Sequence, residues 1–209
     1  MTIKRRKGYM TLEEWHAKLK AEGRYDAMIE LQRQQDEELQ RRAAEWARVE
    51  QPLAEELRAA GFAVDSAWDL VNTSVPYPKA LPILLEHLER PYPWRVREGI
   101  ARALAVRDAK FAWGVLLRLF KEEKEKMVKD GLACALAAAS DDDVIGDLID
   151  LVRDPTQVSR VLLLTAFDRS ADPRARTTLM ELGADPVFKD ASRLILRKMN
   201  HNERRKRKR

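Results

Sequence analysis

Apolar residues recur at helical spacing from about residue 77 to residue 199, in segments of roughly 10–15 residues separated by connections of a few residues. Short connections make neighbouring helices antiparallel. In three places an Asp that can accept a hydrogen bond from the first turn precedes a Pro suited to the first helical position. These pairs are Asp154-Pro155, Asp172-Pro173 and Asp185-Pro186. The pattern predicts an all-α array of antiparallel helix pairs.

The second helix of each pair repeats along the chain. Residues 96–104, 128–136, 158–166 and 188–196 align without gaps, and their starts differ by 32, 30 and 30 residues. The fourth place of the segment holds a small residue in three of the four copies, at Gly99, Gly131 and Ala191. A small residue at a shared position indicates that neighbouring helices approach closely there.

The segments 96–104 and 128–136 resemble the second helix of HEAT repeats, with a Val-Arg-x-x-Ala-type core followed by small residues and Leu. The resemblance covers residues 77–199 and implies an α-solenoid of about four helix pairs. It also implies that the second helices line a concave side used to bind proteins or nucleic acid. The later copies depart from the pattern: residues 158–166 are more apolar, and Ser192 stands where Ile100 and Leu132 occur.

The first 62 residues lack this repeat and form a predicted N-terminal helical extension, ahead of the repeat region at 63–199. Thr11 and Glu14 have capping-box spacing, so a short helix is expected to begin there. A long polar helix is expected to follow from Arg24 to about Glu50, with Pro52 kinking it or starting another. Apolar residues spaced near 3.5 positions apart form a seam along this region. We expect the seam to pack against another helix, either within the chain or on a second copy as a homodimer. The seam comprises Leu39, Trp46, Leu53 and Leu57.

The repeat register predicts a charged surface on the second helices. It places position 98 pointing away from the packed stripe and position 97 on its flank, so charged rows are expected to run between repeats. Such a ladder either lightly stabilises the face or recognises a partner. The expected partner-binding residues of the concave face are Arg97, Glu98, Arg102, Lys129, Asp130, Arg160, Lys189 and Arg193.

The positive charge is concentrated at one end. Residues 1–60, 61–192 and 193–209 carry net charges of 0, −3 and +8, within a total of +5. We expect residues 200–209 to form a disordered basic tail, because like charges repel and no apolar residue offsets the ordering. Its cations could attract nucleic acid or an acidic protein partner, or aid solubility. They are Arg204, Arg205, Lys206, Arg207, Lys208 and Arg209.

Residues suited to catalysis are scattered. His16, His87 and His201 lie far apart and belong to no metal motif, and Cys134 sits in an apolar run. We therefore expect no enzyme activity, metal or cofactor. A less favoured alternative is a HEAT-like DNA glycosylase, whose cleft would need Trp94 or Trp113 exposed beside Asp130.

The sequence favours a non-catalytic adaptor or scaffold that binds a protein, and the fold analogy extends to immunity partners that block a toxin. The alternative is a nucleic-acid-binding accessory protein that uses the tail together with Arg97, Lys129 and Lys189. The basic N-terminus is followed by no long apolar segment, so neither a signal peptide nor a transmembrane helix is expected. A single cysteine cannot form an internal disulfide, so the sequence does not require an oxidising compartment. The expected location is the cytoplasm.

Overall fold

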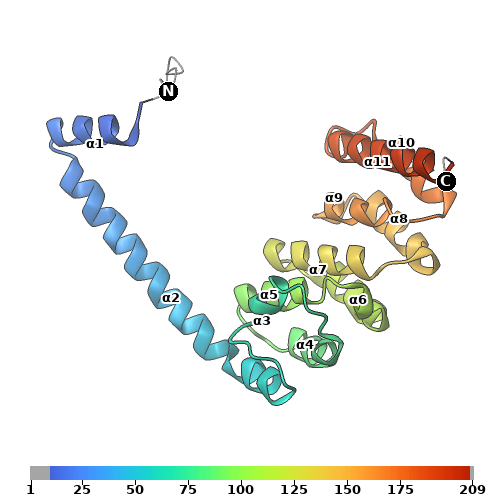
Figure 1. The fold of residues 1–209 in the computed structure, drawn as a ribbon, viewed down its shortest axis with the longest axis horizontal. Helices are drawn as coiled ribbons and strands as arrows, with labels where there is room; N and C mark the ends of the chain where they lie inside the picture. Colours follow the sequence, from blue (N-terminus) through green and yellow to red (C-terminus); the bar gives the residue numbers. More distant parts are fainter. Residues whose placement is uncertain (1–9, 208–209) are drawn as a thin grey trace. The chain divides into compact units, whose positions relative to one another are not determined.

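The computed structural model describes residues 10–207, with side chains through residue 202. Every regular element in this part of the chain is a helix, and no strand occurs in it (Figure 1). The chain divides into two compact units, Met1–Glu45 and Trp46–Arg209. This division lies earlier than the predicted boundary at residue 62, because Leu53 and Leu57 are fully buried in the core of the second unit.

The first unit contains α1 (Leu12–Ala21) and the beginning of α2 (Tyr25–Ala59). The predicted capping box is confirmed: the Thr11 hydroxyl accepts from the backbone N–H of Glu14, whose carboxylate accepts from the N–H of Thr11. Gly23 joins the two helices with a φ of 65°, in the left-handed region that favours glycine. Pro52 starts no new helix, because α2 is continuous through it.

Ion pairs within the helix stabilise the polar middle of α2. Arg33 bonds to Glu30 and Glu37, and both Arg41 and Arg42 bond to Glu38. These partners lie three or four positions apart, where side chains on a helix face one another. A helix that is polar on all sides is typically stabilised by pairs of this kind.

The second unit is a succession of short helices after the end of α2. The α-helices are α3 (Ala67–Val71), α4 (Leu81–Leu88), α5 (Trp94–Ala103), α6 (Trp113–Glu122), α7 (Lys126–Ala139), α8 (Ile145–Arg153), α9 (Arg160–Leu163), α10 (Pro173–Leu182) and α11 (Lys189–Arg207). Four 3₁₀ segments connect them within the described residues: η1 (Pro78–Ala80), η2 (Arg107–Ala112), η3 (Asp142–Val144) and η4 (Leu164–Ala166).

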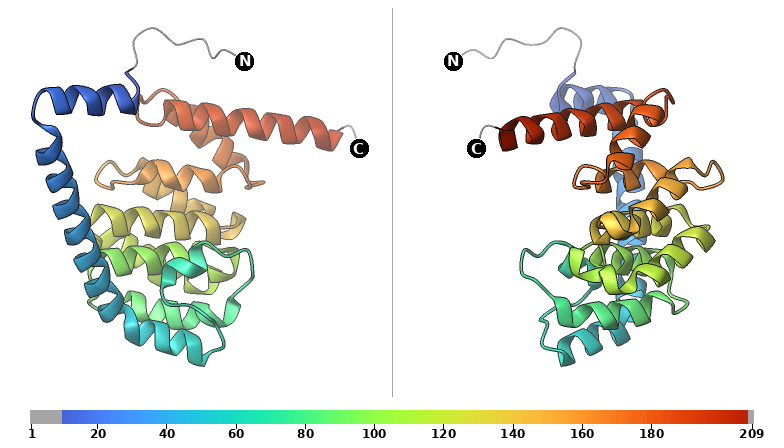
Figure 2. Two further views of the ribbon diagram at one scale, coloured as in Figure 1. Left: turned by 60° about the vertical axis from the view of Figure 1, so that its left-hand side comes forward. Right: turned by 90° about the vertical axis from the view of Figure 1, so that its right-hand side faces the viewer.

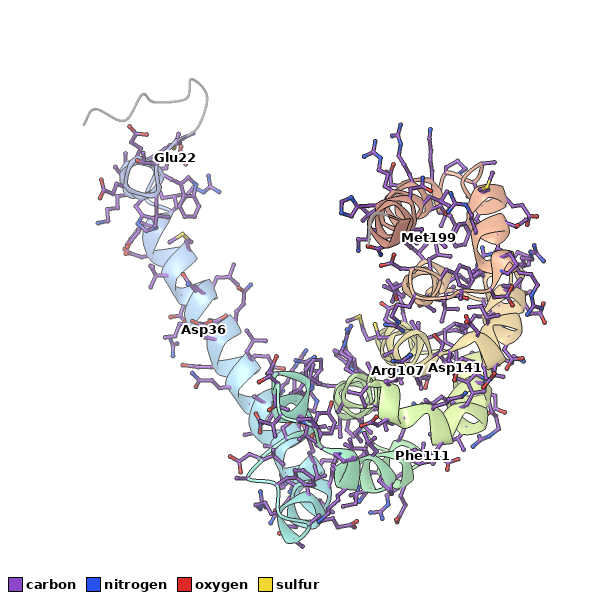
Figure 3. All side chains as sticks on the ribbon, turned by 45° about the vertical axis from the view of Figure 1, so that its right-hand side comes forward. Glu22, Asp36, Arg107, Phe111, Asp141 and Met199 are labelled. Atoms are coloured by element: carbon purple, nitrogen blue, oxygen red, sulfur yellow. The ribbon has the colours of Figure 1, made fainter. Side chains whose placement is uncertain are left out.

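Neighbouring helices of this unit pack in two directions. Along the chain, α4 contacts α5, α6 contacts α7, α8 contacts α9, and α10 contacts α11. Across the layers, α5 contacts α7, α7 contacts α9, and η4 contacts α11. Figures 2 and 3 show the resulting layers: α5, α7, α9 and α11 form one row, which we call the inner row, and α6, α8 and α10 form the outer row. One continuous apolar core runs from Leu53 to Ile195.

Two of the three predicted close approaches involve glycine. A Cβ on Gly131 of α7 would lie 3.0 Å from the Ala101 Cβ and 3.2 Å from the Glu98 carbonyl oxygen, both on α5. The prediction of close packing between successive second helices is therefore confirmed at Gly131. A Cβ on Gly99 would instead lie 2.5 Å from the Trp68 indole nitrogen, so α5 also packs closely on α3.

Two elements differ from the sequence-based expectation. The third copy of the second helix is short, because Ser159 has a φ of 66° and α9 begins only after it. The predicted disorder from residue 200 is replaced by helix, because α11 continues to Arg207. Packing of Phe188 and Ile195 anchors the start of α11, and Arg, Lys and Glu extend a helix readily.

A buried carboxylate accepts hydrogen bonds from the residues at the start of α3. Glu50 of α2 accepts a hydrogen bond from the Ala67 backbone N–H at 2.7 Å and from the Ser66 hydroxyl at 3.0 Å. Burial raises the pKa of the Glu50 carboxyl above its ordinary value, although these two hydrogen bonds oppose the shift. Since a raised pKa means that the fold favours the protonated form, this group stabilises the fold most at low pH.

We therefore expect the wild-type protein to gain stability relative to Glu50→Gln as the pH falls. The favourable contribution of protonated Glu50 is complete below the ordinary carboxyl pKa of about 4.3 and is lost as the pH rises through the raised value. Urea unfolding of both proteins between neutral and mildly acidic pH measures the difference in free energy of unfolding. A difference that stays constant, or that moves the other way, would contradict the assignment.

Candidate binding face of the inner row

Polar contacts join successive inner-row helices at equivalent positions. Arg97 at the start of α5 reaches the Glu123 carboxylate, with 2.6 Å between Nη2 and Oε2. Lys129, the equivalent residue of α7, donates to the Gln157 side-chain oxygen at 2.8 Å and to the Glu123 backbone carbonyl at 3.3 Å. Each cation thus reaches the connection that precedes the next inner-row helix. The acceptors are connecting residues rather than the charged row expected from the sequence, and only the Arg97–Glu123 contact joins opposite charges.

Lys129 is buried rather than exposed on a flank. It is 4 % exposed, and its ammonium nitrogen lies 4.8 Å from the centre of the Phe120 ring. Burial lowers the pKa of this ammonium, and the Glu123 carboxylate opposes the shift. The connection through Gln157 covers the position, so Lys129 serves packing between repeats and is not free to bind a partner.

Glu98 is also placed differently from the prediction. It was expected to point away from the packed stripe, yet it is 2 % exposed. Elements on two sides of α5 explain this burial, because α3 and α7 both pack against that helix. The carboxylate accepts from Arg95 at 3.1 Å and from Arg102 at 2.9 Å. Glu98 therefore positions two arginines and cannot itself meet a partner.

Asp130 and Arg160 are likewise engaged within the fold. Asp130 accepts from Lys126 of its own helix and from the Ser159 hydroxyl of the next repeat. Arg160 donates to the Val152 carbonyl at 2.8 Å and lies over the Phe188 ring at 4.9 Å. These contacts hold α7 to the start of α9 and α9 to the start of α11.

The remaining predicted cations lie at the end of the chain. Lys189 and Arg193 of α11 are both exposed. The predicted tail cations at 204–207 belong to α11, but their side chains lie outside the described residues, as do Lys208 and Arg209 altogether. Exposed positive charge on the described part of α11 therefore comes from Lys189, Arg193 and the neighbouring residues 197 and 198.

The predicted helical seam is divided between the two units. Leu53 and Leu57 are core residues of the second unit, and Trp46 packs edge-to-face on Trp94 with 6.0 Å between ring centres. Leu39 belongs to the first unit and is exposed. Docking within the chain thus accounts for the second half of the seam, and pairing with a second copy stays a prediction for the half around Leu39.

The residues considered for a glycosylase cleft have other partners. Trp94 is exposed in part but packs on Trp46, and the Trp113 indole N–H donates to Asp147 at 2.8 Å. Asp130 is bonded to Lys126 and Ser159 as described. These contacts support packing roles for all three residues.

The sequence did not predict a pocket at the C-terminal end of α5. Its volume is about 530 Å³, and residues 70–78 form one wall while α5, η2 and α7 form the other. The Tyr77 hydroxyl donates to the Ala103 carbonyl at 2.8 Å and fixes that segment against α5. Arg102 and Cys134 lie in the wall at the same repeat position, 32 residues apart. The shared repeat position of Arg102 and Cys134 was the signal in the sequence that could have indicated this pocket. The segment that covers the pocket, residues 70–78, lies outside the repeat, so the repeat pattern does not predict it.

The pocket carries more positive than negative charge. Arg102 and Arg107 line it with a single described carboxylate, that of Asp108. Arg102 uses its Nε to hold Glu98, and within residues 10–202 its two terminal nitrogens make no hydrogen bond. Arg107 is exposed and has no ion pair in the same part of the chain. Burial raises the pKa of the Cys134 thiol, and Arg102 opposes that shift.

Arg107 also reaches a second, smaller cavity. That cavity, of about 60 Å³, is lined by Arg107 and Asp141, both labelled in Figure 3. The Asp141 carboxylate is already engaged by the Lys110 ammonium. The Asp142 carboxylate also lines this cavity, and within residues 10–202 the Arg107 guanidinium makes no hydrogen bond.

In the part of the chain that the structure describes, no helix combines the length and apolar character needed to span a membrane. Comparison of the chain with protein families, with curated proteins and with solved structures finds no match.

Proposed function

We propose that the Trp46–Arg209 unit is a HEAT-like α-solenoid of about four antiparallel helix pairs that binds another protein, in the cytoplasm, as a non-catalytic scaffold or adaptor. The pairwise contacts from α4–α5 to α10–α11, and the stacking of α5 on α7 and of α7 on α9, support this architecture. Repeat arrays of this kind expose an extended face along which a partner can lie. An immunity-type partner that blocks a toxin is one form that such binding takes.

The observation that carries the proposal is the pocket beside Arg102. It borders the inner-row helices α5 and α7, and its volume is within the range of about 300–1,000 Å³ that ligand sites occupy. It also presents arginine donors that make no hydrogen bond within residues 10–202. Arginine is enriched at the energetically important centres of protein interfaces. An oriented arginine in a hollow therefore favours recognition over a purely structural role.

Nucleic-acid binding is the second candidate, and the exposed cations of α11 favour it. Arg193, Arg197 and Lys198 are all exposed on that helix. The other part of the expected phosphate grip is weakened, because Arg97 is paired with Glu123 and Lys129 is buried. The contacts of Arg97 and Lys129 therefore favour a protein partner on the inner row over nucleic acid.

Reversing the charge of Arg107 tests the proposed function. We expect proteins retained from native-host cells by the wild-type chain to fall about tenfold with Arg107→Glu, because one charge-assisted contact contributes at least about 1.4 kcal/mol. Lys121→Glu makes the same charge change at an exposed outer-row position and should leave retention unchanged. Quantitative mass spectrometry of the three eluates gives the comparison.

The matched variant makes a negative result informative. Equal retention by Arg107→Glu and wild type would remove the pocket from the binding face. Equal losses with Arg107→Glu and Lys121→Glu would indicate a general charge effect, of the kind that the nucleic-acid alternative predicts. Circular dichroism of all three proteins checks that the fold is kept.

A further inference from the structure

The pocket beside Arg102 has an apolar half. Its lining includes Val71, Val75, Leu81 and Val106, with Pro76 and Pro78 in the covering segment. Val75 is largely exposed at the rim, whereas Leu81 is fully buried at the base of α4. Such a wall favours a ligand that brings an apolar group, because burying apolar surface is worth about 25 cal/mol per Å².

The other half of the pocket is built to hold an anion. Glu98, itself buried, fixes the Arg102 guanidinium through Nε and leaves the paired terminal nitrogens available. A planar pair of N–H donors matches the two oxygens of a carboxylate. Arg107 adds a second guanidinium, and Asp108 is the one carboxylate among the described lining residues, while Glu98 offsets part of the charge of Arg102.

We propose that this pocket binds the C-terminal residue of a partner peptide whose last side chain is apolar. The free carboxylate lies between Arg102 and Arg107, and the apolar side chain lies against Val71 and Val75. This inference rests on the proposed function, since it names the part of a protein partner that the inner row recognises. Capture of a C-terminal carboxylate is an established mode of peptide recognition.

A chain end fits these walls better than other anions do. A phosphate group brings no apolar body to the side formed by Val71 and Val75. An internal Asp or Glu carries its carboxylate on a chain that must continue in both directions, whereas a C-terminus joins the carboxylate and an apolar side chain at one Cα. The covering segment 70–78, fixed by the bond from Tyr77 to Ala103, forms one wall of the pocket, which suits a chain end that enters from the open side.

Cys134 provides a readout that needs no substitution. It is the one cysteine of the chain, it lines the pocket, and it is half-buried. A peptide seated beside it shields the thiol from alkylation. The rate at which iodoacetamide adds to the full-length protein, followed by intact mass at mildly alkaline pH, therefore reports occupancy of this pocket.

The experiment compares short peptides with one sequence that ends in leucine. We expect the free-acid peptide to slow alkylation of Cys134 in proportion to occupancy, and the C-terminal amide to have little effect. Arg107→Gln should weaken protection by the free acid about tenfold, because it removes one charge-assisted pair. Lys121→Gln, the matched control on α6, should leave protection as in the wild type.

Each other outcome overturns the inference in a distinct way. Equal protection by the acid and the amide would show that the carboxylate is not recognised. Equal protection by 4-methylpentanoate would show that a small organic acid, and not a peptide end, is the ligand. If no peptide protects Cys134 while Arg107→Glu still reduces partner retention, the C-terminal inference fails and the proposed function stands; if both experiments are negative, both fail.

Discussion

Truncation of Phe120 to alanine lowers the free energy of unfolding by about 3–5 kcal/mol, the usual cost of removing a buried aromatic ring. Phe120 is 0 % exposed at the end of α6 and belongs to the continuous core. Its ring also lies beneath the Lys129 ammonium, so the change leaves a buried cation above an empty space. We therefore expect a value toward the upper end of that range.

Phe111 provides the matched control. It is 59 % exposed in η2, and Figure 3 labels it. The same truncation there should change stability by less than about 0.5 kcal/mol. Urea unfolding followed by circular dichroism measures both variants, and a smaller loss for Phe120→Ala than for Phe111→Ala would contradict the described core.

Opposite signs are expected when alanine replaces two of the helical glycines. Alanine favours a helix over glycine by up to about 1 kcal/mol. At Gly99 the new Cβ would lie 2.5 Å from the Trp68 indole nitrogen and 2.9 Å from its Cδ1. The Arg95 guanidinium stacks on the Trp68 ring at 4.0 Å, so a shift of the ring would also disturb that contact. Overpacking of this kind costs about 1–3 kcal/mol, so Gly99→Ala should destabilise the protein on balance.

At Gly114 the same substitution to alanine brings the new Cβ close to no other atom. A Cβ built on it meets no atom within 4 Å, and it lies in the first turn of α6. Gly114→Ala should therefore raise the free energy of unfolding by about 0.5–1 kcal/mol. Denaturation midpoints of the two variants give the comparison, and stabilisation by Gly99→Ala would disprove the close approach of α3 and α5.

The sequence was sufficient for features that depend on local pattern. Apolar spacing located most helices of the second unit, the capping box located the start of α1, and the shared glycine position anticipated the contact of α5 with α7 at Gly131. These features depend on residues close in the chain or one repeat apart. Periodicity therefore carries the information needed to predict them.

The candidate site was harder to predict because it depends on a segment outside the repeat. Periodicity placed Glu98 away from the packed stripe of α5, but α3 and α7 both pack against that helix and Glu98 is buried. The same non-repeating region supplies residues 70–78 to the pocket. Arg102 was predicted as part of a charged concave face, whereas its orientation by Glu98 in the wall of a pocket required the three-dimensional arrangement.

The prediction made from charge alone was also wrong for the end of the chain. Repulsion between cations predicted disorder after residue 200, yet α11 extends to Arg207. Helix propensity and the anchored first turns at Phe188 and Ile195 outweigh the repulsion. The cations of this segment therefore belong to a helix, and their spacing follows helical geometry.

The ladder from Arg97 and Lys129 has a consequence for how the length of this chain can vary. Connections between helices usually tolerate insertions and deletions, because few contacts depend on their length. Here Glu123 and Gln157 lie in connections and accept from the preceding inner-row helix. An added residue would shift the acceptor away from its cation, and at the second connection the buried Lys129 would keep only the Glu123 carbonyl at 3.3 Å. Length changes in relatives of this protein should therefore avoid these two connections.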